Sequence, residues 1–402
     1  MVDFNPFDYA FHEDPYPVYA ALRREAPVYH NPSLGFWAFA RHADVLAAFK
    51  DWQTYSNKGG VSLEQGANEA GDTTAFLSML GMDPPRHDGL RSLVSRGFTP
   101  RRVNALEPRI RELAIHYIER FRDRGECDFV AEFAGKLPMD VVSEMVGVPE
   151  ADRDMLRSWA DQVLHREEGV MGLPEAATQA AAKLYAYYVD LVKERKQKPG
   201  EDLVSALLDT ELEGKRLGDT DVIGFLFLMI VAGNETTTKL LANALYWADR
   251  NPDEREKVRR DESAIPRWVE ETLRYDNSTQ LLARTITRDH EVGGHLLREG
   301  EKALLLVGSA NRDEEVWERA DVYDIDRDTS ASLSFGRGTH FCLGASLARL
   351  EARISLEELQ RRVPEIHVRH EGLVRVHSTN VRGFAALPIE FATGGERAST
   401  PN

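Results

Sequence analysis

The sequence predicts a mainly α-helical protein with a few small β-sheets. Most segments repeat apolar residues with helical periodicity and end at conventional stop residues, whereas the strand signals are fewer and shorter. No Pro/Gly/Ser-rich linker or low-complexity tract divides the 402 residues. We therefore expect a single domain that spans residues 1–402.

The elements follow from these patterns in chain order. The main predicted helices cover residues 16–25, 42–51, 86–98, 104–124, 175–196, 219–249, 266–274 and 343–360. The predicted strands cover residues 28–30, 35–40, 284–287, 302–307, 374–377 and 386–391. The longest apolar run, 222–233, is too short to cross a bilayer and continues into polar residues. It therefore predicts a buried helix.

Composition limits the possible partners and the compartment. Hydrophobic residues at 42% and charged residues at 29% are typical of a soluble protein with a large core. The formal net charge of -16 argues against nucleic acid or an anionic membrane as a partner. Residues 1–6 lack the features of a signal peptide or anchor, which predicts a cytoplasmic protein. With only Cys127 and Cys342 a disulfide framework is not expected, and Cys127 is predicted to pack in the core.

One segment departs from the acidic average. Residues 86–111 hold seven arginines against Asp88 and Glu107. The segment can be an ordinary solvated helical face. Alternatively, it can be a docking patch that attracts an acidic partner protein through long-range charge.

Residues 335–344 place Cys342 in a glycine-punctuated loop that leads directly into a predicted helix. A thiol ligates a metal as the thiolate, and N–H groups at a helix start favour that charged form. Gly336, Gly338 and Gly344 allow unusual backbone angles and leave room for a flat cofactor. The alternative is that Cys342 is a small buried apolar residue, as free cysteines often are.

This loop resembles the cysteine loop of the cytochrome P-450 haem-thiolate monooxygenases, whose pattern is Phe-x-x-Gly-x-x-x-Cys-x-Gly. Phe335, Gly338, Cys342 and Gly344 occupy its fixed places. The resemblance extends from residues 14–17 to residues 382–388. It implies the cytochrome P-450 fold, a triangular helical prism around one haem b. Cys342 would ligate the haem iron, and Phe335, Gly336 and Gly344 would lie beside the cofactor.

Residues 232–237, Ala-Gly-Asn-Glu-Thr-Thr, lie midway along the predicted central helix. Gly233 lowers helix propensity, and the Thr236 hydroxyl can bond to the Ala232 carbonyl and loosen the helix there. The alternative is a core helix with one buried, paired carboxylate. The segment is similar to the family's Ala-Gly-x-Asp/Glu-Thr-Thr signature. By that resemblance Ala232 and Gly233 border the haem, and Glu235 and Thr236 are the catalytic residues that organise proton delivery.

Two further sets of residues match the family pattern. Glu271 and Arg274 share one helix face, and an isolated pair of this kind is usually a weak surface ion pair. By resemblance they join Arg327 in a folding role that holds the cysteine loop. His87 and Arg91, four residues apart, can grasp one anionic group. The resemblance implies that the haem propionates are held by His87, Arg91, Arg284 and His340.

Substrate contacts are placed only by the resemblance. The candidates are nearly all apolar: Leu77, Leu80, Phe225, Met229, Ala232, Leu281, Leu282 and Val381. An apolar stripe at helical spacing is more often core than pocket. If these residues line a pocket, they imply a lipophilic substrate such as a fatty acid, terpenoid, steroid or polyketide.

The implied activity is that of a monooxygenase that inserts one oxygen atom from O2 into a C–H bond. Two cysteines cannot ligate an iron–sulfur cluster and no reductase-sized region remains. We therefore expect electrons from a ferredoxin or flavodoxin served by an NAD(P)H-dependent reductase. Two alternatives stay open: a haem-thiolate peroxygenase that uses peroxide, and a non-enzymatic haem-thiolate ligand sensor. The Glu235–Thr236 pair favours oxygen activation over both.

Overall fold

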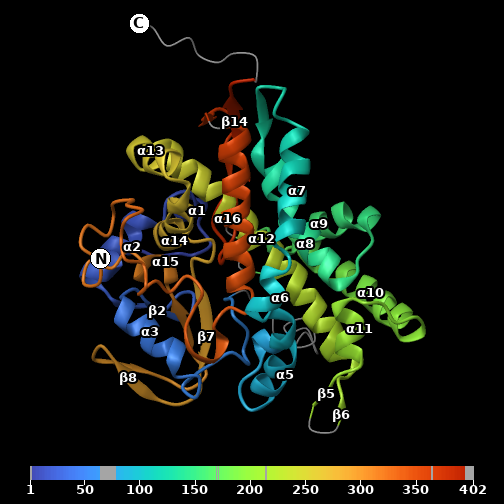
Figure 1. The fold of residues 1–402 in the computed structure, drawn as a ribbon. Coiled ribbons are helices and arrows are strands. Elements are labelled where there is room, and N and C mark those ends of the chain that lie inside the picture. The colour runs from blue at the N-terminus through green and yellow to red at the C-terminus, as the bar shows by residue number, and fades with distance from the viewer. Residues whose placement is uncertain are drawn as a thin grey trace, which may run out of the picture.

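A long central helix organises the molecule. The structure is a computed structural model that describes residues 2–63, 78–168, 170, 172–212, 215–363 and 365–393. Helix α12 (Asp219–Arg250) is apolar around much of its circumference, so other helices cover it on several sides. Figure 1 shows α12 in the middle of the fold, with most strands on one side and the helices α8 to α11 on the other. The helices that pack on α12 include α8 (Leu137–Val146), α9 (Glu150–Leu164), α10 (Glu175–Gln197), α14 (Ile265–Tyr275) and α16 (Ala345–Arg362).

The remaining helices are shorter. They are α1 (Tyr9–Glu13), α2 (Tyr16–Glu25), α3 (His42–Lys50), α5 (Arg86–Val94), α6 (Pro100–Asn104), α7 (Glu107–Glu119), α11 (Leu203–Leu208), α13 (Pro252–Arg260) and α15 (Val307–Ala310). Short 3-10 turns form at η1 (Ser78–Gly81), η2 (Ser95–Phe98), η4 (Glu262–Ala264) and η5 (Gly338–His340), and η3 (Val130–Ala134) is a π turn. Helices α7 and α16 pack side by side, as Figure 1 also shows.

The strands form small, separate sheets. The largest has the order β1 (Val28–Asn31), β2 (Phe36–Phe39), β10 (Lys302–Leu305), β7 (Leu282–Ile286) and β3 (Tyr55–Ser56). Only its β2–β10 pair is parallel. A second sheet joins β11 (Ile366–Val368), β14 (Pro388–Phe391) and β4 (Glu126–Asp128). Two-stranded ribbons are formed by β12 (Val374–Arg375) with β13 (Phe384–Ala386), β5 (Glu211–Leu212) with β6 (Lys215–Arg216), and β8 (His290–Val292) with β9 (His295–Leu297).

The fold class predicted from the sequence is confirmed, but several boundaries are wrong. The predicted helix 104–124 corresponds to α7, which begins only at Glu107 and ends at Glu119; Pro108 lacks an N–H and is tolerated only in the first turn of that helix. Helices α8, α9 and α13 were not predicted. The strand 386–391 is interrupted at Leu387, so that its residues belong to two different sheets.

The central helix is the buried helix that the apolar run predicts. It has the length and composition of a membrane span, yet 72% of its apolar window is buried inside the molecule, as in a core helix. Its first half, up to Ile230, packs into one hydrophobic cluster with α8, α9 and α10. Its second half, from Leu240, packs into another with α7, α14 and α16. Residues 232–237 lie between the two clusters, where Asn234, Glu235 and Thr237 are buried and Ala232 is exposed.

Candidate functional site

The loop before α16 holds Cys342 in a defined position. The Cys342 N–H donates to the Phe335 carbonyl over 2.9 Å. Gly336 and Gly338 have φ angles of 68° and 72°, and a Cβ on Gly338 would lie 2.6 Å from the Phe49 carbonyl oxygen. Both positions therefore require glycine. Gly344 has an ordinary φ of -83°, so the expectation of an unusual angle is wrong there; an added Cβ would nevertheless meet no atom within 4 Å.

The surroundings of Cys342 act on its thiol in opposite directions. Burial raises the pKa of the thiol, whereas the N–H groups of Gly344 and Ala345 and the guanidinium groups of Arg91 and Arg349 act to lower that pKa. The N–H groups at the start of α16 therefore stabilise the thiolate, as the sequence predicts. Burial nevertheless prevails, so the protein alone keeps the thiol protonated. A bound metal ion would supply the missing stabilisation of the thiolate.

The middle of α12 carries the predicted side-chain bond. The Thr236 hydroxyl donates to the Ala232 carbonyl over 2.8 Å, which confirms that prediction. The helix nevertheless runs without interruption from Asp219 to Arg250, so the bond does not break it. A Cβ on Gly233 would lie 3.2 Å from a methyl group of Val142. The glycine therefore lets α8 approach α12 closely, and its predicted contact with a cofactor stays a prediction.

Glu235 lies next to Thr236 and is tied to other charged groups. Its carboxylate is 2.9 Å from the Lys239 ammonium group, and both side chains are only 5% exposed. Asp161, from α9, is hydrogen-bonded to the same carboxylate. Burial alone would raise the pKa of Glu235, but the charge of Lys239 and the hydrogen bond from Asp161 outweigh it and lower that pKa.

Asp161 and Lys239 were both missed from the sequence. The Glu235–Lys239 spacing of four residues is a readable signal for an ion pair on one helix face. Asp161 gave no comparable signal, because its distance in sequence from Glu235 says nothing about the packing of α9 on α12.

Four cationic or donor groups were predicted to hold an anion, and this role stays a prediction; the structure shows the surroundings of three of them, Arg284, His87 and His340. Arg284 is 3% exposed, and among the described residues no acidic side chain lies within ion-pair distance of it. Burial lowers its pKa to about 10. The imidazole rings of His87 and His340 lie 4.2 Å apart, and the Nε2 atom of His340 is buried with no partner in the described part of the chain. Burial, and then the nearby His87, lower the pKa of His340 to about 3.

Within the described residues Arg284 lacks the counterion that a buried cation requires, whereas His87 contacts Asp88 over 2.9 Å. A ligand with carboxylate groups fits these groups, because it would neutralise Arg284 and accept hydrogen bonds from the two imidazoles. Arg91 is only half-buried, and it lies close enough to Cys342 to influence its charge. Arg91 therefore lies near both the Cys342 thiol and His340.

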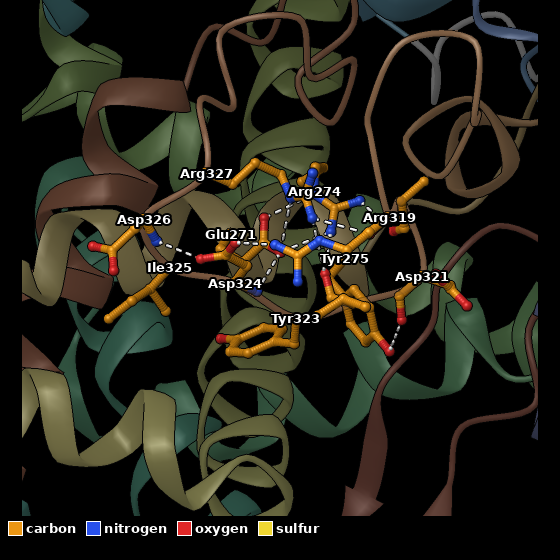
Figure 2. Close-up of polar contacts among 12 residues, drawn as sticks. Glu271, Arg274, Tyr275, Arg319, Asp321, Tyr323, Asp324, Ile325, Asp326 and Arg327 are labelled. Atoms are coloured by element: carbon orange, nitrogen blue, oxygen red, sulfur yellow. Dashed lines mark hydrogen bonds and ion pairs between the residues drawn. The ribbon is translucent and has the colours of Figure 1, made fainter.

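The predicted clamp beneath the cysteine loop is confirmed, and Figure 2 shows its residues converging. Arg274 makes two hydrogen bonds of 2.7 Å to Glu271, and neither side chain is exposed. The Arg327 Nε atom lies 3.7 Å from the Glu271 carboxylate. Arg274 also donates to the carbonyl of Asn311, whose side chain contacts Leu333 and Ser334 just before the loop. The clamp therefore fixes the chain segment that leads into the Cys342 loop.

The arginine-rich segment is only partly free. Arg109 binds Glu144 over 2.8 Å, and Arg111 binds Glu357 over 2.8 Å as well as Glu358. Arg86 binds Asp221 over 2.8 Å. Arg96, Arg101 and Arg102 are exposed and form no ion pair within the described residues. The paired arginines belong to an ordinary ion-paired surface, and the docking patch stays a prediction for the other three.

The predicted substrate contacts fall into three groups. Phe225, Met229, Leu281 and Val381 are at most 7% exposed, and the first three pack within core clusters. Leu80 and Leu282 are half-buried, whereas Ala232 is exposed in the middle of α12. Leu77 lies outside the described residues. Of these positions, Ala232 offers the most accessible surface beside Thr236.

Comparison with known proteins decides the family. The protein named cytochrome P450 123 in Mycobacterium tuberculosis is 53% identical to this chain over 386 residues, which cover 96% of each protein. The chain belongs to the cytochrome P450 family. The family model described as Cytochrome P450 matches residues 173–362 of this P450.

Solved P450 structures have the same fold. CYP109E1 from Bacillus megaterium, in complex with testosterone, has a TM-score of 0.88 and 31% identity, and the match covers 94% of this P450 and 97% of that chain. CYP268A2 from Mycobacterium marinum, in complex with pseudoionone, has a TM-score of 0.88 and 33% identity over 97% and 98% of the two chains.

Family membership makes this P450 a haem-thiolate monooxygenase, an oxidoreductase with a haem cofactor. The residues present fit that cofactor. Arg284 lacks an anion that the propionates would supply, and Gly344 leaves open space beside the only thiol that directly precedes a helix. Cys342 would ligate the iron, and His87, Arg91, Arg284 and His340 would hold the propionates.

Proposed function

We propose that this P450 uses haem b to insert one oxygen atom from O2 into a C–H bond of a lipophilic small molecule. The observation that carries the proposal is the Thr236 hydroxyl, held on the Ala232 carbonyl beside the buried Glu235. Oxygen activation consumes protons, and a hydroxyl next to a buried acid is a means of supplying them. A peroxide-using enzyme has no such need, and a ligand sensor has none either.

The protein's residues have separate tasks in this scheme. Haem with a thiolate ligand supplies oxygen activation, since the thiolate donates electron density that favours O–O cleavage. Cys342 would ligate the haem iron, and the buried Arg284 would bind the haem carboxylates. Thr236 orients a proton donor, and Glu235 connects it to the charged groups behind α12. The remaining task, positioning of the C–H bond, belongs to the apolar residues around Ala232.

The substrate class rests on those apolar side chains and on the ligands of the relatives. CYP109E1 is solved with testosterone and CYP268A2 with pseudoionone. We place the substrate of this P450 in the same broad group of fatty acids, terpenoids, steroids and polyketides. A set of such compounds should be screened for spin-state shifts in the haem absorption spectrum.

Electrons would come from a separate ferredoxin or flavodoxin with its NAD(P)H-dependent reductase, in the cytoplasm. Arg96, Arg101 and Arg102 are exposed, form no ion pair with any described residue, and would attract such acidic proteins. If they do, the rate of reduction should fall with rising salt, because exposed charges are screened.

One comparison tests the activity. The purified P450 is given a substrate from the screen, once with O2, reductase, ferredoxin and NADPH, and once with hydrogen peroxide alone. We expect hydroxylated product in the first reaction. Product from peroxide alone would instead indicate a peroxygenase. Tight binding without oxidation in both reactions would indicate a sensor.

A further inference from the structure

A buried carboxylate joins the end of strand β3 to the start of helix α5. The Asp83 carboxylate accepts a hydrogen bond of 2.5 Å from the Ser56 hydroxyl and one of 3.0 Å from the Asn57 N–H. The Asp83 carbonyl accepts a bond of 3.1 Å from the His87 N–H, in the first turn of α5. Asp83 therefore binds a strand through its side chain and a helix through its main chain.

The bonds to the Asp83 carboxylate are shielded from water and have defined directions. Asp83, Ser56 and Asn57 are 6%, 4% and 1% exposed. The Ser56 hydroxyl oxygen accepts from the Lys58 N–H over 3.0 Å, while its own proton is donated to Asp83. A buried carboxylate is costly unless it is hydrogen-bonded, and these bonds meet that requirement. The contact is therefore a built part of the interior.

The two elements joined in this way carry the predicted donors to the haem carboxylates. Strand β3 pairs with β7, where Ser56 lies opposite Thr285, the residue after Arg284. Helix α5 carries His87 and Arg91. The two sets of donors lie far apart in the sequence, so their separation in space depends on how α5 is attached to the sheet.

Asp83 also acts on Arg284 without pairing with it. Burial lowers the pKa of the Arg284 guanidinium to about 10, and the negative charge of Asp83 acts to raise that pKa. The two described side chains nevertheless form no ion pair: Asp83 is bound to Ser56 and Asn57, and Arg284 donates to the carbonyl of Ala283. The Arg284 guanidinium therefore stays available for a ligand.

We propose that Asp83 is a positioning residue of this P450, which holds Arg284 of β7 and His87 of α5 at the separation that the haem carboxylates require. Asp83 does not touch the cofactor, because its carboxylate is already bound to the chain. The inference rests on the proposed placement of the haem carboxylates, but not on the reaction that the haem performs. The competing explanation is that Asp83 only stabilises the fold.

Transfer of haem from the ferric holoprotein to an excess of apomyoglobin measures the rate at which the cofactor is lost. Asp83→Ala removes both side-chain bonds and should speed haem loss by about tenfold to a hundredfold, as for other residues that orient the ligands of a bound group. Asp83→Asn keeps an oxygen for the Asn57 N–H, and its amide can donate to the Ser56 hydroxyl oxygen. It should therefore lose haem at nearly the rate of the unmutated protein. Loss as fast as in Asp83→Ala would overturn the inference, because the charge of Asp83 would then matter and not its position.

A second buried carboxylate separates positioning from general stability. Asp140, in α8, is 8% exposed, accepts a bond of 2.5 Å from the Tyr117 hydroxyl and lies 3.1 Å from Arg153. Asp140→Ala should lower the free energy of unfolding, as Asp83→Ala does, but leave the rate of haem loss unchanged. Equal acceleration in the two variants would contradict the inference, because haem loss would then only follow stability.

A double substitution tests whether Asp83 acts through Arg284. Asp83→Ala should speed haem loss by a smaller factor in the Arg284→Met background than in the unmutated protein, because one of the groups that Asp83 positions is then absent. Equal factors in the two backgrounds would show that the residues act independently, and the inference would be wrong.

Ser56→Ala covers the case in which Asp83→Ala does not fold. It removes one of the two bonds to the carboxylate and should speed haem loss by a smaller factor than Asp83→Ala. An unchanged rate in Ser56→Ala would count against the inference. These measurements need no substrate, oxygen or electron donor. Failure of the proposed function would appear separately, as absence of hydroxylated product from a protein whose haem loss still responds to Asp83.

Discussion

Glu271 and Arg274 face each other one turn apart on α14, and their ion pair is completely shielded from water. Two hydrogen bonds of 2.7 Å fix the guanidinium group on the carboxylate. The remaining donors of Arg274 bind carbonyl groups of Asn311, Ala320 and Val322. A charge that is buried in this way is stable only while its partner is present.

Glu271→Gln should therefore destabilise the protein severely. The substitution leaves the buried Arg274 without a counter-charge, which costs about 3–5 kcal/mol. Denaturant unfolding of the holoprotein measures the loss, and the haem content of the purified variant shows whether the cysteine loop still forms. Glu270→Gln is the matched control, because Glu270 is 30% exposed and binds Arg349 at the surface. It should cost about 1 kcal/mol or less. Equal losses in the two variants would show that burial of the pair does not matter.

Thr236→Ala should separate electron consumption from product formation. The variant lacks the Thr236 hydroxyl, which bonds to the Ala232 carbonyl and is the proposed last group to deliver protons to oxygen. Because proton delivery is then impaired, reduced oxygen should be released as hydrogen peroxide. Peroxide released per NADPH consumed should rise severalfold, with haem content unchanged. Thr210→Ala is the control, because Thr210 makes the same type of bond to Ala206, in α11. Unchanged coupling in Thr236→Ala would contradict the assigned role.

Arg284→Met should weaken haem binding by the holoprotein but stabilise the apoprotein against unfolding. The holoprotein loses a charge-assisted bond to the propionates, worth about 1.5–3 kcal/mol, and its haem affinity should fall by about tenfold to a hundredfold. The apoprotein loses a buried cation that lacks an acidic partner among the described residues, so it should become more stable. Haem transfer to a competing apoprotein and denaturant unfolding of the apoprotein measure these effects. Arg288→Met, two residues beyond β7 and mostly exposed, should change neither.

Glu351 should make stability depend on pH. Burial in α16 raises the pKa of its carboxyl group from 4.5 to about 8. Between these values the folded protein binds one more proton than the unfolded chain, so stability falls as the pH rises through this window. Glu351→Gln should remove this part of the pH dependence and be the more stable protein at pH 9, by an amount on the order of a few kcal/mol.

Glu358→Gln provides the contrast on the same helix. Glu358 is 2% exposed, but Arg111, Arg361 and Arg362 bind it, so its loss should destabilise the protein at pH 9. If Glu351→Gln and Glu358→Gln both stabilised the protein at pH 9, the ion pairs of Glu358 would not be what makes its ionised form favourable.

The sequence predicted the parts of the site that depend on local pattern. The glycines around Cys342, the Thr236 bond to Ala232 and the Glu271–Arg274 pair all involve residues close in the chain. Arg327 was found as well, although only through the resemblance to the family. Such contacts are set by backbone geometry, which short motifs encode.

Other parts of the site could not be predicted, because they depend on packing between segments that are distant in the sequence. Asp161 was missed because α9 itself was not predicted, and the ion pairs of Arg109 and Arg111 join α7 to α8 and α16. The net balance of opposing effects on the Cys342 thiol could not be predicted either, because burial is a property of the folded chain. In the same way, Phe225 and Leu281 have the composition of pocket residues but are covered by core side chains.

The buried guanidinium of Arg284, which has no acidic partner among the described residues, has a consequence for the living cell. A chain that has not yet acquired its cofactor retains an internal positive charge that opposes folding, and the carboxylates of haem remove that penalty. Partly unfolded chains are the ones that proteases degrade. The steady-state abundance of this P450 should therefore follow the cell's haem supply, with iron starvation depleting the protein even while its messenger RNA is unchanged.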